Sequence, residues 1–438
     1  MLRLLLAASI VLLGVHPQRA NADAVTGTWT GDAQVRGNYY WDRSTRVLAP
    51  EFIAQLEAPQ GTRMRVDYLV DSITSASIAA GALEDVRFTE VRHDVDLKAG
   101  HEFVERENPV DLFGGFRLSR EPDYFSFATL FQPTIWLADR ATMFRGRISY
   151  RHDEIGQTFR GGSQQRPDNM GGTSADAFRE TLDAVSLAAG WEQVLSRTLV
   201  LEVGYDFTYQ WGFLANPYRS VLGGQIPENH PGQRYRHLLF SRLAWYIPRS
   251  RTSLQVLYRS YVDNWKVSAV NPEFRIYQEM SPFFQTRLRY RYYTQTSSFF
   301  YKSNPNDYSL DDQYVTADPK LSEFHVNELG IQFLVLGAFL EGKAHRSIAG
   351  AQFDISFNYR WNRGQDPPLQ PTEFMVVLKG KSHRILSNST IGLWDPWLRL
   401  SVIPRAYDGG SCPYLNGKGV EQVMGGGFQG GASVEGIA

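Results

Sequence analysis

The chain of 438 residues carries 45 lysines and arginines against 46 acidic residues, so its net charge of −1 gives no electrostatic argument for a nucleic-acid partner. Its single cysteine, Cys412, excludes an internal disulfide framework and a zinc site built from several cysteines. Aromatic residues make up 13% of the chain, which is rich for a soluble enzyme and ordinary for a membrane barrel.

The first residues have the pattern of a secretory signal. Arg3 supplies a positive charge, Leu4 to Val15 form an apolar stretch, and the Ala-Asn-Ala of residues 20–22 fits a cleavage site. We therefore predict a cleaved signal peptide over residues 1–22. No later stretch approaches the roughly 18 uninterrupted apolar residues of a spanning helix, so the exported protein is predicted to be periplasmic, secreted or an outer-membrane barrel.

Strand patterns fill most of the mature chain. Residues 23–61 hold only weak candidates and are expected to form a periplasmic or first-strand segment. From Thr62 onward apolar and polar residues alternate, most clearly over Leu199 to Trp211. Such a strand has one apolar face and one mostly polar face. The run also exceeds the usual soluble strand of about five or six residues and reaches the roughly 9–11 that a membrane-crossing strand needs.

The connections between these runs differ in length. Tight turns are expected at 195–198 and 248–251, and long polar loops at 161–175, 216–233 and 303–319. Bacterial barrels place tight turns on the periplasmic side and long loops outside.

The fold that follows is all-β. We predict one antiparallel up-and-down transmembrane β-barrel over residues 62–406, with roughly 12–18 strands and a wet interior. The alternative is a soluble all-β protein with one solvated face. Residues 407–438 form a Gly-rich tail, which departs from the terminal aromatic strand of a typical barrel.

Three arginines recur at every second position of one strand pattern. Arg287, Arg289 and Arg291 alternate with apolar or aromatic residues, so they would line one inner wall at about 6.6 Å spacing and bias a pore towards anions. In the alternative interpretation they pair with acids on other strands. The further candidates for lining the lumen are Glu202, Asp206, Asp354 and Arg360.

Two other groups carry a functional and a structural interpretation. Asp67, Asp71, Thr74 and Ser75 could bind sugar hydroxyls or a metal, but we favour the structural interpretation, in which they satisfy backbone groups at a strand end. His93 lies beside acidic residues, yet it is mid-strand and no spacing resembles a barrel enzyme. We therefore predict no catalytic residues, no metal site and no cofactor.

Two sequence motifs in residues 63–94 give information that the strand pattern does not. Residues 63–77 contain "DYLVDSITSAS", and residues 85–94 contain "RFTEVRH", which includes Arg92 and His93. This pair of motifs resembles a family of Gram-negative proteins catalogued only as a domain of unknown function. The resemblance is specific over about residues 62–97 and looser along the barrel. It implies an outer-membrane barrel related to myxobacterial porins that work beside a periplasmic export protein in exopolysaccharide export.

Together these observations predict a porin or export channel rather than an enzyme. The expected partners are outer-membrane lipid and, by the resemblance alone, polysaccharide and a periplasmic export protein. We expect a monomer in the outer membrane of a Gram-negative bacterium. Two alternatives remain, namely a soluble exported binding protein and a barrel-type outer-membrane hydrolase.

Overall fold

The computed structural model describes residues 30–41, 45–76, 87–104, 107–156, 178–337, 351–363, 372–380, 384–385 and 397–403. The predicted signal peptide and the Gly-rich tail lie outside these residues. The strands are β1 (Thr30–Trp41), β2 (Thr45–Glu57), β3 (Thr62–Ala76), β4 (Arg87–Phe103), β5 (Val110–Glu121), β6 (Tyr124–Leu137), β7 (Thr142–Gly156), β8 (Arg179–Ser196), β9 (Leu199–Gly212), β10 (Ser220–Val221), β11 (Ile226–Pro227), β12 (Gln233–Ile247), β13 (Thr252–Asp263), β14 (Ser268–Ser281), β15 (Phe284–Gln295), β16 (Phe324–Leu336), β17 (Ala351–Arg363), β18 (Thr372–Gly380), β19 (Arg384–Ile385) and β20 (Trp397–Ile403). The 3₁₀ turns are η3 (Leu222–Gly224), η4 (Pro305–Asp307) and η5 (Pro319–Leu321). No helix in these described ranges has the length and apolar character needed to cross a membrane.

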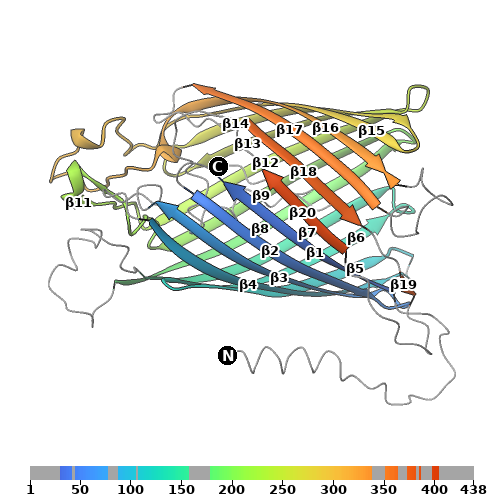
Figure 1. Cartoon of the computed structure of the whole chain (residues 1–438), viewed down its shortest axis with the longest axis horizontal. Helices are drawn as coiled ribbons and strands as arrows, with labels where there is room; N and C mark the ends of the chain where they lie inside the picture. The colour runs from blue at the N-terminus through green and yellow to red at the C-terminus, as the bar shows by residue number, and fades with distance from the viewer. Residues whose placement is uncertain are drawn as a thin grey trace, which may run out of the picture.

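The long strands form one sheet of 18 strands that curves into a barrel (Figure 1). Successive strands pair antiparallel from β1 to β9, from β9 across to β12, and on to β18. β20 then pairs antiparallel with β18 and parallel with β1, so the pairings return to the first strand. This confirms the predicted all-β, antiparallel, up-and-down architecture, with a strand number at the upper end of the predicted range.

The contact between β1 and β20 is the one departure from antiparallel pairing among the strand pairs that the structure describes in this sheet. This parallel pairing follows from the number of strands in the barrel. Because β19 contributes only two residues, the long strands of the circuit are odd in number, and an alternating circuit of odd length must contain one parallel neighbour. Residues 30–41 and 45–57, which belong to the weakly patterned N-terminal segment, form full strands of the same sheet.

The strands have an apolar outer face and a polar inner face. In β9, Glu202, Thr208 and Gln210 are buried on the inside, whereas Tyr205 between them is exposed. Other strands repeat the pattern, with Ile148 of β7 55% exposed. Exposed apolar side chains of this outer wall include Phe116, Phe131, Leu187, Leu239, Val256, Leu288 and Leu329.

The two ends of the barrel differ. One end carries tight turns, among them 197–198 and 282–283, and the other carries the long connections 213–232 and 296–323. The two long loops, which contain β10, β11 and the three 3₁₀ turns, extend from the end of the barrel shown at the left of Figure 1. They pack together through a core of Val221, Tyr308 and Val315.

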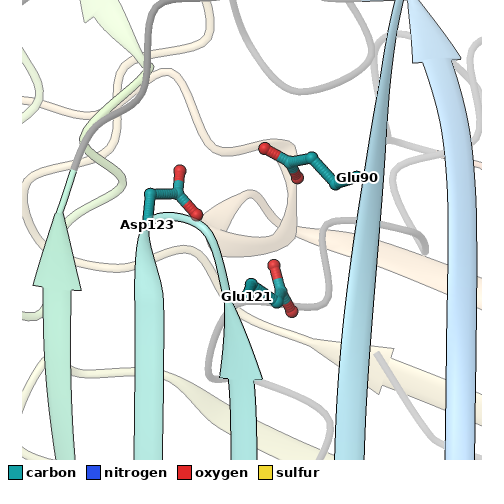
Figure 2. Close-up of side chains that lie close together, drawn as sticks. All are labelled: Glu90, Glu121 and Asp123. Carbon is teal, nitrogen blue, oxygen red and sulfur yellow. The ribbon is translucent and has the colours of Figure 1, made fainter. Parts of the chain in front are cut away.

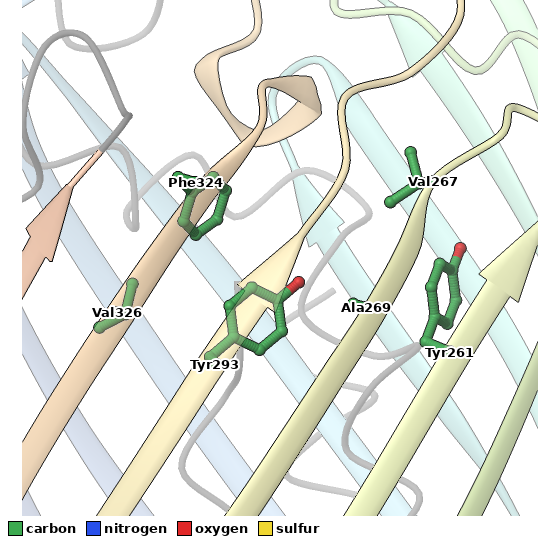
Figure 3. Close-up of a cluster of buried hydrophobic side chains, with 6 residues drawn as sticks. All are labelled: Tyr261, Val267, Ala269, Tyr293, Phe324 and Val326. Carbon is green, nitrogen blue, oxygen red and sulfur yellow. The ribbon is translucent and has the colours of Figure 1, made fainter.

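Below the loops, the part of the inner wall formed by β13 to β16 carries an apolar cluster. Figure 3 shows Tyr261 of β13, Ala269 of β14, Tyr293 of β15 and Phe324 of β16 at the ends of neighbouring strands, where they form one buried cluster with Val267 and Val326. Since the loops cover this end, the wall facing them packs like a core.

Candidate functional site

The lumen wall carries many ion pairs, both between strands and within a single strand. Arg and Lys side chains reach acids one or two strands away or two residues along the same strand. The pairs include Arg63–Asp111, Arg92–Asp71, Arg117–Asp94, Arg147–Asp206, Arg151–Asp153, Arg234–Asp263 and Arg242–Glu202. Such a wall is polar, and most of the arginines in these pairs are neutralised by an acid of the same wall.

The three predicted arginines of β15 lie on one inner wall, but two of them share an acid. Arg291 donates from Nη2 to Oε2 of Glu328 at 2.8 Å, and Arg289 pairs with the other oxygen of the same carboxylate. Glu328 is 0% exposed and lies on the adjacent strand β16. Arg287 instead donates to Gln332 at 3.3 Å and lies 5.3 Å from the ring centre of Tyr277.

The partner Glu328 was missed because it belongs to a strand whose register could not be assigned. Register places Arg291 directly opposite Glu328, and the sequence alone gives no register across a long loop. The two predicted lumen acids whose side chains the structure describes pair with other arginines. Glu202 accepts from Arg242 Nε at 2.7 Å, and Asp206 accepts from Arg147 at 3.2 Å. Asp354 and Arg360 lie in β17, and their side chains are outside those described.

The motif block forms cross-strand contacts between β3 and β4. Asp71 and Arg92 are register partners and form a 2.5 Å ion pair. Asp67 accepts from Arg65 Nε at 2.8 Å. The side chains of Thr74 and Ser75 lie outside those described.

His93 points to the outer face of the barrel. Its Nδ1 is hydrogen-bonded to the hydroxyl of Tyr68 at 3.0 Å, and the ring of Tyr68 stacks on it. A histidine in this position faces away from the lumen wall that carries Asp71 and Arg92.

Three carboxylates that the sequence did not single out gather at the loop end. Figure 2 shows Glu90 of β4, Glu121 of β5 and Asp123 of the following turn directed towards one another, and their oxygens lie within 4.8 Å. Carboxylate oxygens are the ligands that Ca²⁺ prefers. One Asp123 oxygen accepts a hydrogen bond from Tyr218, which ties the loop 213–232 to this turn.

The centre of the loop cap is a buried carboxylate, Glu228. It accepts hydrogen bonds from the backbone N–H of Asn216 at 2.9 Å and of Ala317 at 3.1 Å, and from the hydroxyl of Thr316. His230 Nε2 lies 3.3 Å from its Oε1, and Arg219 pairs nearby with Asp318. One acid therefore holds backbone and side chains of both loops.

The electrostatics of this network follow from its neighbours. Burial alone would raise the pKa of Glu228, but His230, Arg219 and the hydroxyl of Thr316 lower it to about 2. For Arg219, burial would lower the pKa, whereas Asp318 and Glu228 raise it above its usual range. The carboxylate and the guanidinium are therefore both charged near neutral pH.

Between the cap and the inner wall the structure leaves a cavity of about 150 Å³. Here it is called the cap chamber. Its walls combine aromatic rings with charged and polar groups, and they include Tyr124, Phe213, Tyr261, Trp265, Tyr293, Gln210, Arg234 and Arg236. The polar composition of residues 216–233 and 303–319 predicts two long loops, but no pattern in the chain predicts that they converge on aromatic residues of the inner wall.

Comparisons with known proteins give one family and several distant structures. The model of the family described as "Protein of unknown function (DUF3570)" matches residues 83–336. A search of curated proteins found no significant match.

Among solved structures, a variant of the ferric enterobactin receptor from Pseudomonas aeruginosa has 10% identity and a TM-score of 0.43, covering 84% of this chain and 61% of the receptor. The siderophore receptor PirA from Acinetobacter baumannii has 7% identity and a TM-score of 0.43, covering 87% and 59%. The outer membrane protein OprD from Pseudomonas aeruginosa has 9% identity and a TM-score of 0.41, covering 82% and 94%. The chain thus spans about three fifths of the length of the two receptors.

Proposed function

Since the chain belongs to the DUF3570 family of proteins of unknown function, we propose a function from its own geometry: a barrel in the outer membrane of a Gram-negative bacterium that passes solute through its lumen. The observation that carries this proposal is the two-faced wall. Apolar side chains cover the outside of the described strands, and paired charges line the inside.

The outer face supports a membrane location. Side chains such as Ile148, Val256 and Leu329 are half exposed around the wall, and a continuous apolar surface of this extent is unfavourable in water. Near the loop end, Tyr209 stacks on Tyr235 at 4.7 Å between ring centres and also on Trp211, as expected for an aromatic girdle. A cleaved signal peptide over residues 1–22 belongs to the same proposal.

The inner face supports passage of polar solute. Its charged groups keep the lumen wet, and their pairing leaves no strong net field across most of the wall. The cap formed by the loops 213–232 and 296–323 narrows one end of the path to the cap chamber. Small solutes are therefore the first cargo to test.

Export of exopolysaccharide is the finer form of this proposal, with a periplasmic export protein as partner. It rests on the motif block in residues 63–94. Export of this kind requires an extended polymer chain to pass the cap formed by the two loops. We propose a monomer that acts without a cofactor.

A hydrolase and a soluble binding protein are less well supported. His93, the first candidate for an acid–base group, is hydrogen-bonded to Tyr68 on the outer face, away from the polar lumen. A soluble binding protein would expose the apolar outer wall to water.

Liposome swelling tests the proposal. Proteoliposomes holding the folded protein should swell when transferred into an isotonic solution of a small uncharged sugar, and more slowly as the sugar becomes larger. Liposomes holding heat-unfolded protein serve as the control. No swelling above this control in any sugar would contradict the channel, and recovery of the protein in the soluble fraction after an alkaline membrane wash would contradict the location.

A further inference from the structure

The cap chamber is lined by an arginine that forms no ion pair among the described residues, whereas the chamber's two carboxylates, Glu228 and Asp318, pair with His230 and Arg219. Arg236 of β12 lines the chamber, and its Nε is buried without a hydrogen-bond partner. Within the described part of the chain no carboxylate pairs with this guanidinium. Holding an unpaired charge away from bulk water is unfavourable, so the site favours an anion from solution.

The nearest acid is already occupied. Asp263 of β13 is the register partner of Arg236, yet its Oδ2 accepts from Arg234 Nε at 2.8 Å and from Tyr261 Oη at 2.6 Å. Its Oδ1 accepts from the backbone N–H of Val267 at 2.9 Å. Asp263 therefore pairs with Arg234 and fixes the turn after β13, and none of its hydrogen bonds goes to Arg236.

A second polar group in the chamber also lacks a partner. Gln210 of β9 is 2% exposed, and its Oε1 is buried with no hydrogen-bond partner. Gln210 lies opposite Arg234 in the register, and the next inward residue of β9, Thr208, lies opposite Arg236. The unpaired acceptor and the unpaired guanidinium are thus neighbours on one patch of wall.

The remaining walls suit a ring. Phe213, Trp265 and Tyr293 line the chamber together with Tyr261, and Trp265 is held by Arg234, whose guanidinium lies 4.1 Å from its ring centre. The cavity volume of about 150 Å³, counted at about 10–15 Å³ for each water molecule, holds roughly ten waters, which is enough space for a small ring.

We propose that the cap chamber binds one sugar acid, a hexuronate, as the solute of the channel. Arg236 binds its carboxylate through two N–H groups, Gln210 accepts a hydrogen bond from a sugar hydroxyl, and the aromatic side chains cover the apolar face of the ring. A neutral sugar lacks the first contact, and an aromatic acid lacks the second. The inference rests on the proposed function because the chamber lies on the solute path.

Calorimetric titration of the purified, detergent-folded protein tests the inference. The ligands are glucuronate, glucose as the neutral sugar, and benzoate as a ring-bearing acid without hydroxyls. We expect glucuronate to bind at least about tenfold more tightly than either, since loss of one charge-assisted contact in an enclosed site is worth that factor or more. Equal binding of benzoate and glucuronate, or no binding of glucuronate, would overturn the inference.

Variants locate the site. Arg236→Gln should weaken glucuronate binding at least about tenfold. The affinity of Arg236→Lys should lie between those of the wild type and Arg236→Gln, because a lysine keeps the charge but cannot bind both carboxylate oxygens in the same plane. The matched control is Arg259→Gln, which removes another inward-facing arginine of the neighbouring strand outside the chamber and should leave binding unchanged. If R236Q binds like the wild type, the assignment is wrong. If R236Q does not fold, the Lys variant and the ligand comparison decide.

The binding assay contains no membrane, so it tests the sugar-acid site independently of the channel. Conductance without glucuronate binding would overturn the chamber as a sugar-acid site and leave the channel intact. Glucuronate binding without conductance or swelling would support the chamber and contradict the channel.

Discussion

Thr316 donates a hydrogen bond from Oγ1 to Oε1 of Glu228 at 2.5 Å, and this contact joins two loops that are distant in sequence. Both residues are 0% exposed. The same carboxylate also accepts from the backbone of Asn216 and of Ala317, so one acid bridges both loops of the cap. Backbone hydrogen bonds between Asn229 and Val315 and the ion pair of Arg219 with Asp318 join the same two loops.

Removing the charge of Glu228 should open the cap. Glu228→Gln keeps the size of the side chain but removes the negative charge that raises the pKa of Arg219, and losing one partner of a buried charge pair costs about 3 kcal/mol or more. We expect faster protease cleavage within 213–232 and 296–323. Asp311→Asn, an exposed acid in the second loop, is the control. Unchanged cleavage in E228Q would show that the apolar contacts between the loops suffice.

Acid should open the cap in the wild type only at low pH. The pKa of Glu228 falls from its ordinary 4.5 to about 2 in the folded loops, so its stabilisation is complete above about pH 4.5 and is lost as the pH falls towards 2. Protease cleavage of the loops by an acid-tolerant protease, followed between pH 7 and 2, checks this. An opening transition centred above about pH 5 would mean that another group controls the cap.

The wall was more predictable from sequence than the cap. Alternation along Leu199 to Trp211 depends only on the geometry of a strand, so the side of each residue could be predicted correctly. The partner of Arg291 depends on register across a long loop, and the position of Glu228 depends on how two loops pack. Neither leaves a periodic signal in the chain, because both are decided by contacts between distant segments.

The shared carboxylate of Glu328 should set the charge selectivity of the lumen. Glu328→Gln leaves Arg289 and Arg291 without their acid, so the reversal potential in a salt gradient should shift towards anions. Replacing Arg287, Arg289 and Arg291 together by Gln should shift it towards cations. The control is Asp311→Asn, which removes an exposed charge of the loop 296–323. Shifts of the same sign in both variants would contradict the assignment.

A close contact inside the lumen should couple Gly204 to Phe240. A Cβ added at Gly204 would lie 2.1 Å from Cε1 of Phe240, its register partner on β12, so the ring must move in Gly204→Ala. We expect a loss of about 1–3 kcal/mol in unfolding free energy, the usual range for overpacking. Thermal unfolding, followed by loss of the heat-modifiable gel band, measures it. In the Phe240→Ala background the same change should have little effect, and an equal effect in both backgrounds would disprove the coupling.

Conductance across a planar lipid bilayer tests the central claim most directly. The purified, folded protein should insert and give discrete, ion-carrying steps, and E228Q should give larger steps than the wild type because its cap no longer narrows the mouth. The absence of any step from protein that still shows the heat-modifiable mobility of a folded barrel would contradict the proposal that this wall encloses a path for solute.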